Sequence, residues 1–184
     1  MQISHETKRA KKVIVELVRQ AGGQIQNKTN LFLAFWKAHL HYAANSPGYL
    51  SNWPIVRTPN GPAIGEFDYL LSEMLADGWL TIDEIQLGDR PAMVFSLGPN
   101  CPPLSLPKDG AEAVREGIKA VDGRSNGALS DQSYRQSRVW RETKDGEEME
   151  IYLDLMNDAQ RDQREANLAE LAKAIGMPYA TSRK

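Results

Sequence analysis

The chain has few of the residues that usually carry chemistry. Its 184 residues include one cysteine, Cys101, and three histidines. A single cysteine cannot form an internal disulfide, which suits a reducing compartment. His39 and His41 are two residues apart on an expected helix, so they point to different sides and cannot share a metal ion as an i, i+4 pair would. The glycines follow none of the spacings of phosphate-binding loops. We therefore predict no catalytic, cofactor-binding or metal site, and no enzymatic activity.

The chain also lacks a surplus of charge of one sign and a long apolar run. A net charge of −2 and a pI of about 6.0 give no general attraction to nucleic acid or to an anionic membrane. No apolar stretch approaches the roughly 20 residues that cross a bilayer. The first residues are not followed by the apolar block of a secretory signal. These absences predict a cytoplasmic protein without a membrane segment.

What is present is an ordinary globular composition, 41% hydrophobic and 25% charged. We expect a single domain over residues 1–184, with a core over about residues 5–157 and a C-terminal helix over about residues 158–176. Apolar residues at helical spacing predict further helices before that one. These helices are expected over residues 4–21, 27–45, 63–77, 108–121 and 129–140. Residues 149–156 alternate as a strand would, but their spacing favours a helix.

The first expected helix begins with Ser4, whose hydroxyl can accept from the first-turn amides. Its apolar stripe leaves a basic cluster on the opposite side, which we expect to be a solvated face. The cluster consists of Lys8, Arg9, Lys11 and Lys12. The second expected helix, residues 27–45, is apolar around much of its circumference, which predicts a central position. His39 lies on its buried stripe and is interpreted as a core histidine with its hydrogen bonds satisfied.

A proline- and glycine-rich loop follows over residues 45–62. We expect a short extended piece within it, because the residue before each proline is pushed out of helical geometry. Tyr49, Trp53 and Ile55 either pack onto the core or form a contact surface, and both alternatives stay open. Pro62 is expected in the first turn of the next helix, where its missing amide costs nothing.

Two strand-like runs, residues 79–86 and 92–97, flank a turn and predict a β-hairpin. A helix followed by a hairpin is the layout of a winged-helix module. The expected fold class is therefore mainly α with a small β-hairpin, a compact helical domain with a winged-helix-like helix–hairpin segment. A DNA-reading helix is normally rich in basic or amide side chains. The helix over residues 63–77 instead has four acidic residues and no basic one, which disfavours nucleic-acid binding through it. The acidic residues are Glu66, Asp68, Glu73 and Asp77.

The run KTNLFLAFWKAHLHYAANSPGYLSNWPIVRTPNGPAIGEFDYLLSEMLADGWL resembles the Panacea domain, also called SocA-like, of bacterial and phage antitoxin-type proteins. Its marks are the aromatic helix, the PGYL…WPIVR loop, the NGP before the next helix and the hairpin after it. A later run, GALSDQSYRQSRVWRE, resembles the second block of the family. There the family tends to carry a histidine where this chain has Tyr134. If that histidine matters, this protein has lost or altered what it does.

The resemblance implies a mostly α fold with a small hairpin and no enzymatic activity. Family members bind and neutralise a toxin encoded beside them, and some are known only as phage-associated. The expected function is a non-enzymatic antitoxin or adaptor that neutralises a partner toxin by direct contact. The expected contact residues are Tyr49, Trp53, Arg57 and Asn60. The alternatives are a winged-helix-like DNA-binding regulator, a phage-associated protein of unknown function and, third, an enzyme. The identity of the partner and the oligomeric state stay open.

Overall fold

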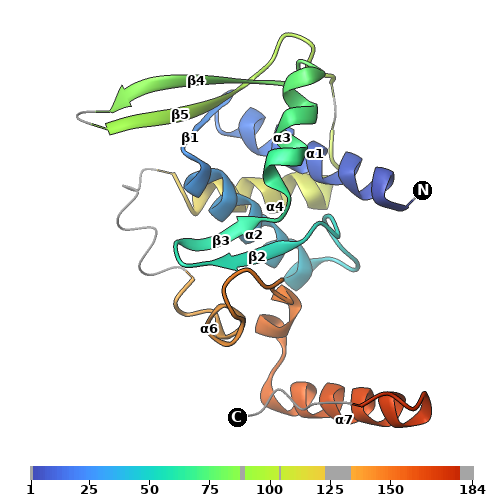
Figure 1. The fold of residues 1–184 in the computed structure, drawn as a ribbon. Helices are drawn as coiled ribbons and strands as arrows, with labels where there is room; N and C mark the ends of the chain where they lie inside the picture. Colours follow the sequence, from blue (N-terminus) through green and yellow to red (C-terminus); the bar gives the residue numbers. More distant parts are fainter. Residues whose placement is uncertain (1, 88–89, 104, 123–133, 179–184) are drawn as a thin grey trace.

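The computed structural model describes residues 2–87, 90–103, 105–122 and 134–178 (Figure 1). Helices form about half of the chain, and two small antiparallel sheets make the fold mixed α/β. The α-helices in the described ranges are α1 (Gln2–Gln20), α2 (Lys28–Asn45), α3 (Phe67–Ala76), α4 (Lys108–Lys119), α6 (Arg138–Glu142) and α7 (Asp158–Ala174). A 3-10 helix, η1, spans Ile151–Leu155. The strands are β1 (Gln24–Gln26), β2 (Ile55–Thr58), β3 (Gly61–Ile64), β4 (Leu80–Leu87) and β5 (Arg90–Leu97).

Helix α2 is the centre of the fold, as its apolar sequence predicts. It packs against α1, α4, β1, β3 and η1, so its sides are covered by elements from both halves of the chain (Figure 1). Burial around most of its circumference keeps this helix in place although its pattern is hardly amphipathic. Its buried residues are Leu31, Leu33, Ala34, Phe35, Trp36, Ala38 and His39.

Helix α1 differs from the prediction at both its start and its charged side. It begins at Gln2, so Ser4 lies inside the helix and not at its cap. Lys11 is only 8% exposed, and its ammonium lies 2.7 Å from the Glu73 carboxylate and 3.5 Å from that of Asp77. A solvated face is therefore wrong for Lys11, because α3 covers this side of α1 and supplies the carboxylates.

The predicted hairpin is confirmed as β4 and β5, which pair in register from Leu80 opposite Leu97. A third strand, β1, pairs with β5 on its other side, which gives the order β1-β5-β4. The prediction missed β1 because it is three residues long and only Ile25 within it is buried. The hairpin reaches away from the helices at the end of the molecule opposite α7 (Figure 1).

The second sheet corrects the prediction for the proline-rich region. Pro62 lies in β3 opposite Arg57 of β2, and α3 begins only at Phe67, so the expected helix start at residue 63 is wrong. Gly61 has φ 118°, which a residue with a side chain rarely adopts, and this allows the chain to return as a strand. Pro62 is tolerated there because a proline without an amide hydrogen suits an edge strand.

The other edge of β2 is covered by a segment that we call the strap, residues 144–151. Its backbone pairs with β2 through Arg57 N–H to Glu147 O at 3.0 Å and Met149 N–H to Ile55 O at 2.7 Å. The end of the strap turns into η1, so the helical interpretation of residues 149–156 is confirmed only for residues 151–155, and there as a 3-10 helix. Two distant parts of the sequence thus form one layer beside α2.

The last helices agree with the prediction in part. Ser137 caps α6 by accepting from Trp140 N–H at 3.0 Å, so this helix starts later than the expected range. Residues 129–133 of that range lie outside the described residues. Helix α7 is confirmed, and Asn157 begins it with a capping box. The assignment of residues 1–184 to one domain stays a prediction. None of the described helices has both the length and the apolar character that a bilayer span requires.

Helix α4 approaches α2 closely at Gly117, and this contact generates a prediction. A Cβ at Gly117 would overlap the carbonyl oxygen of Ala34 and lie 3.1 Å from the Cβ of Ala38. Gly117→Ala should therefore lower the free energy of unfolding by about 2 kcal/mol, although alanine is normally the better helix former. Urea denaturation measures the change. Arg115→Ala on the exposed face of α4 is the control and should change stability by about 0.5 kcal/mol or less. A Gly117→Ala protein as stable as the control would contradict the close packing.

Candidate functional site

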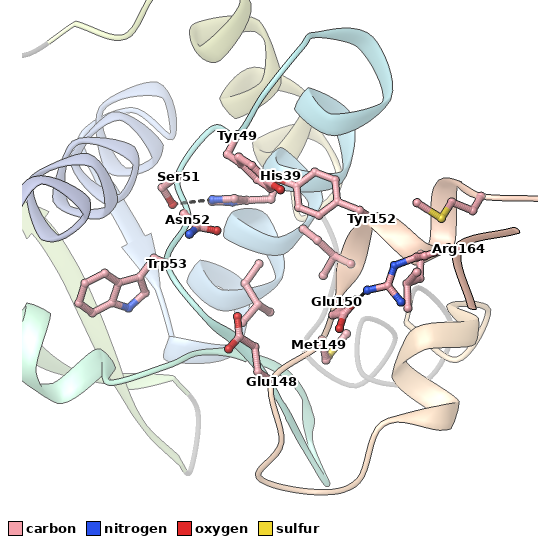
Figure 2. Close-up of a pocket in the computed structure, with 14 residues that line it drawn as sticks. His39, Tyr49, Ser51, Asn52, Trp53, Glu148, Met149, Glu150, Tyr152 and Arg164 are labelled. Carbon is pink, nitrogen blue, oxygen red and sulfur yellow. Dashed lines mark hydrogen bonds and ion pairs between the residues drawn. The ribbon is translucent and has the colours of Figure 1, made fainter. Parts of the chain in front are cut away.

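A hollow of about 320 Å³ opens where the loop after α2, the start of β2, the strap and η1 meet (Figure 2). The loop contributes Tyr49 and Trp53, the strap contributes Glu148, and η1 contributes Tyr152. Arg164 reaches it from α7. Its volume is at the small end of the range for ligand sites, which suits one compact group and not a whole helix.

The floor of the hollow contains a buried polar pair, His39 and Ser51. The Ser51 hydroxyl lies 2.7 Å from His39 Nε2 (Figure 2). His39 Nδ1 lies 2.8 Å from the carbonyl oxygen of Phe35. Since a carbonyl can only accept, Nδ1 carries the proton and Nε2 accepts from the hydroxyl. Burial lowers the pKa of His39 to about 4.

This pair has the order of groups found in a nucleophile, its base and an orienting acceptor. Ser51 and His39 are only 3% and 2% exposed, and an imidazole whose pKa is near 4 is a weak base at neutral pH. Both ring nitrogens of His39 have hydrogen-bond partners, and the bond to Ser51 connects α2 to the loop after it. The interpretation of His39 as a satisfied core histidine is confirmed.

Two tyrosines form the aromatic side of the hollow. The rings of Tyr49 and Tyr152 meet edge to face, with centroids 4.8 Å apart and an interplanar angle of 87°. Tyr49 is 48% exposed, and Arg9 donates a hydrogen bond to its carbonyl oxygen. Burial, followed by the neighbouring Tyr49 hydroxyl, raises the pKa of Tyr152 well above its usual range. The Tyr152 ring therefore stays neutral, and both rings present amphipathic surface.

Trp53 lies partly in the core and partly on the lining of the hollow, and its role as a contact residue stays a prediction. Its ring is half-buried, packs against the core and also lines the hollow. The indole N–H donates to the carbonyl oxygen of Gly65 at 2.6 Å, which ties the loop to the end of the second sheet. Ile55 is buried, so at that position the core alternative holds.

Arg57 and Asn60 do not belong to the hollow. Arg57 pairs with Asp145 of the strap, and its guanidinium lies 4.4 Å from the centre of the Trp140 ring. Asn60 is exposed in the turn between β2 and β3. Of the four expected contact residues, the structure therefore brings together Tyr49 and Trp53. The other two lie outside the hollow, Arg57 in β2 and Asn60 in the turn that follows it.

Tyr134, which stands where the Panacea resemblance leads us to expect a histidine, is a buried packing residue. Its ring lies 4.6 Å from that of Trp140, and a Cβ at Gly61 would lie 2.9 Å from it. It is absent from the lining of the hollow. The aromatic ring therefore stabilises the turn between β2 and β3.

Charged residues on the lining were missed by the sequence interpretation. Glu148 and Glu150 are exposed, whereas Met149 and Ile151 between and after them are buried. This alternation is the strand-like signal in residues 148–151, and it arises where Glu148 pairs in isolation with Val56 of β2. Glu150 forms an ion pair with Arg164 of α7. In the described parts of the chain, no group of three His, Cys, Asp or Glu side chains is placed to hold a metal ion.

A second exposed surface lies on α7. No residue of this helix is buried; Leu171 in it is 56% exposed, and Ile175 directly after it is 61% exposed. Ion pairs hold its first half, Arg161 with Glu142 at 3.7 Å and Arg164 with Glu150. Leu171 therefore faces solvent on a helix that is fixed at its other end.

Comparison of the chain with protein-family models, with curated proteins and with solved structures gave no significant match. The resemblance to the Panacea domain therefore stays a prediction.

The buried His39 predicts a pH dependence of stability. Unfolding restores its pKa from about 4 to about 6.5, so the unfolded chain binds the proton more tightly between these values. The stabilisation is fully present above pH 6.5 and is lost as the pH falls toward 4, by about 2 kcal/mol between about pH 7.5 and about pH 5. Urea denaturation at both pH values should show this loss in the wild type. His39→Gln should lack it, and an equal loss in both proteins would contradict the assignment.

Proposed function

We propose that the protein is a non-enzymatic antitoxin or adaptor that neutralises a partner toxin by direct contact, and that the hollow is its contact site. The observation that supports this most is the exposed Tyr49 ring at the mouth of the hollow. Tyrosine and tryptophan contribute large contact area at a small entropic cost and are enriched among residues that dominate binding energy.

The loop that presents Tyr49 is held in place before any partner arrives. The Ser51 hydroxyl is bound to His39, and the Asn52 backbone N–H donates to the Glu6 carboxylate at 2.7 Å. The Trp53 indole is bound to the carbonyl oxygen of Gly65. A surface that is ordered in advance loses less conformational entropy on binding. These contacts support a preformed binding site.

Helix α3 supports protein binding over nucleic-acid binding. We propose that α3 with β4 and β5 has a winged-helix-like layout, since the hairpin follows the helix directly. Its carboxylates are engaged by lysines of other helices, Asp68 by Lys28 at 2.9 Å and Glu73 by Lys11. The helix itself contributes no basic side chain for phosphate. A DNA-binding regulator is therefore the less supported alternative.

Co-expression with each neighbouring gene tests the proposed function. We expect one neighbour to arrest growth alone, to be harmless in the presence of this protein and to co-purify with it in a fixed ratio. If no neighbour is toxic, or if a toxic one is not neutralised, the antitoxin proposal is wrong.

Replacing Tyr49 tests the contact site. Tyr49→Ala should weaken the complex about 10-fold or more, because it removes an exposed ring from the centre of the proposed contact. Its stability should change by about 1 kcal/mol or less, the value of one aromatic pair. Calorimetric titration with the purified partner measures the affinity. Tyr69→Ala is the matched control, since Tyr69 is 47% exposed but lies on α3 outside the hollow. Equal effects of the two changes would exclude the hollow as the contact.

A further inference from the structure

The hollow has one carboxylate that the described residues leave without a counter-charge. Three charged residues line it, and two of these, Glu150 and Arg164, neutralise each other. No ion pair within the described ranges involves Glu148, whose side chain is exposed. At the rim, Arg9 lies 3.6 Å from Glu6, so these two charges also cancel. The lining therefore has a net negative charge that is localised at Glu148.

The rest of the lining suits an apolar stem. Met149 and Ile151 are buried beneath it, and the ring of Tyr152 stands beside them. Figure 2 shows Tyr49 and Tyr152 on one side of the hollow and Glu148 on the other. A group that fits has an aliphatic or planar part against the rings and a positive charge that reaches the opposite side.

We propose that the partner binds by placing one arginine side chain in the hollow, with its stem along Tyr152 and Ile151 and its guanidinium on the Glu148 carboxylate. This inference rests on the proposed function and names the chemistry of the partner at the same site. A guanidinium stacks on aromatic surface and offers a planar fork of donors to a carboxylate. It is also less strongly hydrated than an ammonium group, so it leaves water more easily.

The volume and the neutral groups of the site support a single side chain. About 320 Å³ is the volume of roughly ten liquid waters. His39 and Ser51 on the floor already satisfy each other, so they require no hydrogen bond from a ligand. The Asn52 side-chain amide on the same lining provides a further acceptor for the guanidinium. An anionic partner such as nucleic acid would instead be repelled by Glu148.

A small probe tests the site without the partner. N-acetyl-arginine N-methylamide is titrated into the full-length protein while NMR follows the Trp53 indole N–H and the backbone amides of Ser51 and Met149. We expect saturable shifts at these positions with a dissociation constant on the order of 10 mM. The neutral isostere N-acetyl-citrulline N-methylamide should bind about 5-fold more weakly or not at all. Absent shifts, or equal shifts with both probes, would overturn the inference.

Paired substitutions separate Glu148 from general charge effects. Glu148→Gln should weaken arginine-probe binding about 3- to 10-fold. Glu147→Gln is the matched control, because the adjacent carboxylate faces Lys144 at 4.0 Å and does not line the hollow. It should leave binding unchanged. If both changes weaken binding equally, the effect comes from net charge and the assignment of Glu148 is wrong.

The partner identified by co-expression provides the decisive comparison. Glu148→Lys should weaken the complex about 10-fold or more, and an arginine-to-glutamate change in the partner should restore it. If no neighbour is toxic but the probe binds through Glu148, the proposed function fails and the arginine site stands. If a toxin is neutralised equally by the wild type and Glu148→Lys, and the probe does not bind, the proposed function stands and the arginine site fails.

Discussion

The structure depends on the burial of α2 around most of its circumference. A helix with apolar residues on every side can be stable only when other elements cover all of them. Elements from both ends of the sequence therefore meet on it, α1 and β1 from before it and β3, α4 and η1 from after it. Close packing limits what fits there, as the approach of α4 at Gly117 shows. The position of each surrounding element, and of the hollow between two of them, follows from this requirement.

The hollow is a consequence of how the chain leaves α2. The hydrogen bond between Ser51 and His39 holds the following loop against the helix. Backbone hydrogen bonds hold the strap along β2. The strap then turns into η1 instead of continuing as a strand, and space remains between η1 and the loop. Because the strap alternates between buried and exposed residues, the side chains of Glu148 and Glu150 are exposed on the lining, and Glu148 lies across the hollow from the two tyrosines. Under the proposed function, this partly apolar surface with local negative charge is the one that contacts the partner protein.

Periodicity predicted most of the helices and the β4–β5 hairpin, because their apolar spacing is a local property of the chain. The prediction failed at residues whose local sequence is compatible with two different structures. Pro62 suits the first turn of a helix as well as an edge strand, and the pairing of β3 with β2 decided for the strand. Lys11 has the composition of a solvated residue, yet α3 supplies the carboxylates that allow its burial. Tyr49 and Trp53 could be named as candidate contact residues from the sequence because they are aromatic side chains in a proline-rich loop. Glu148 could not, because in the sequence it resembles any surface acid.

By itself, the sequence determined the number and length of most helices and the central role of α2, since each depends on residues within a few positions of one another. Only the tertiary structure decided which side chains share a site. Tyr49 and Tyr152 are about a hundred positions apart in the sequence, and they meet because α2 must be covered on that side. Whether the Glu148 carboxylate has a counter-charge could also be decided only from the tertiary structure, because packing determines which charged side chains lie near it.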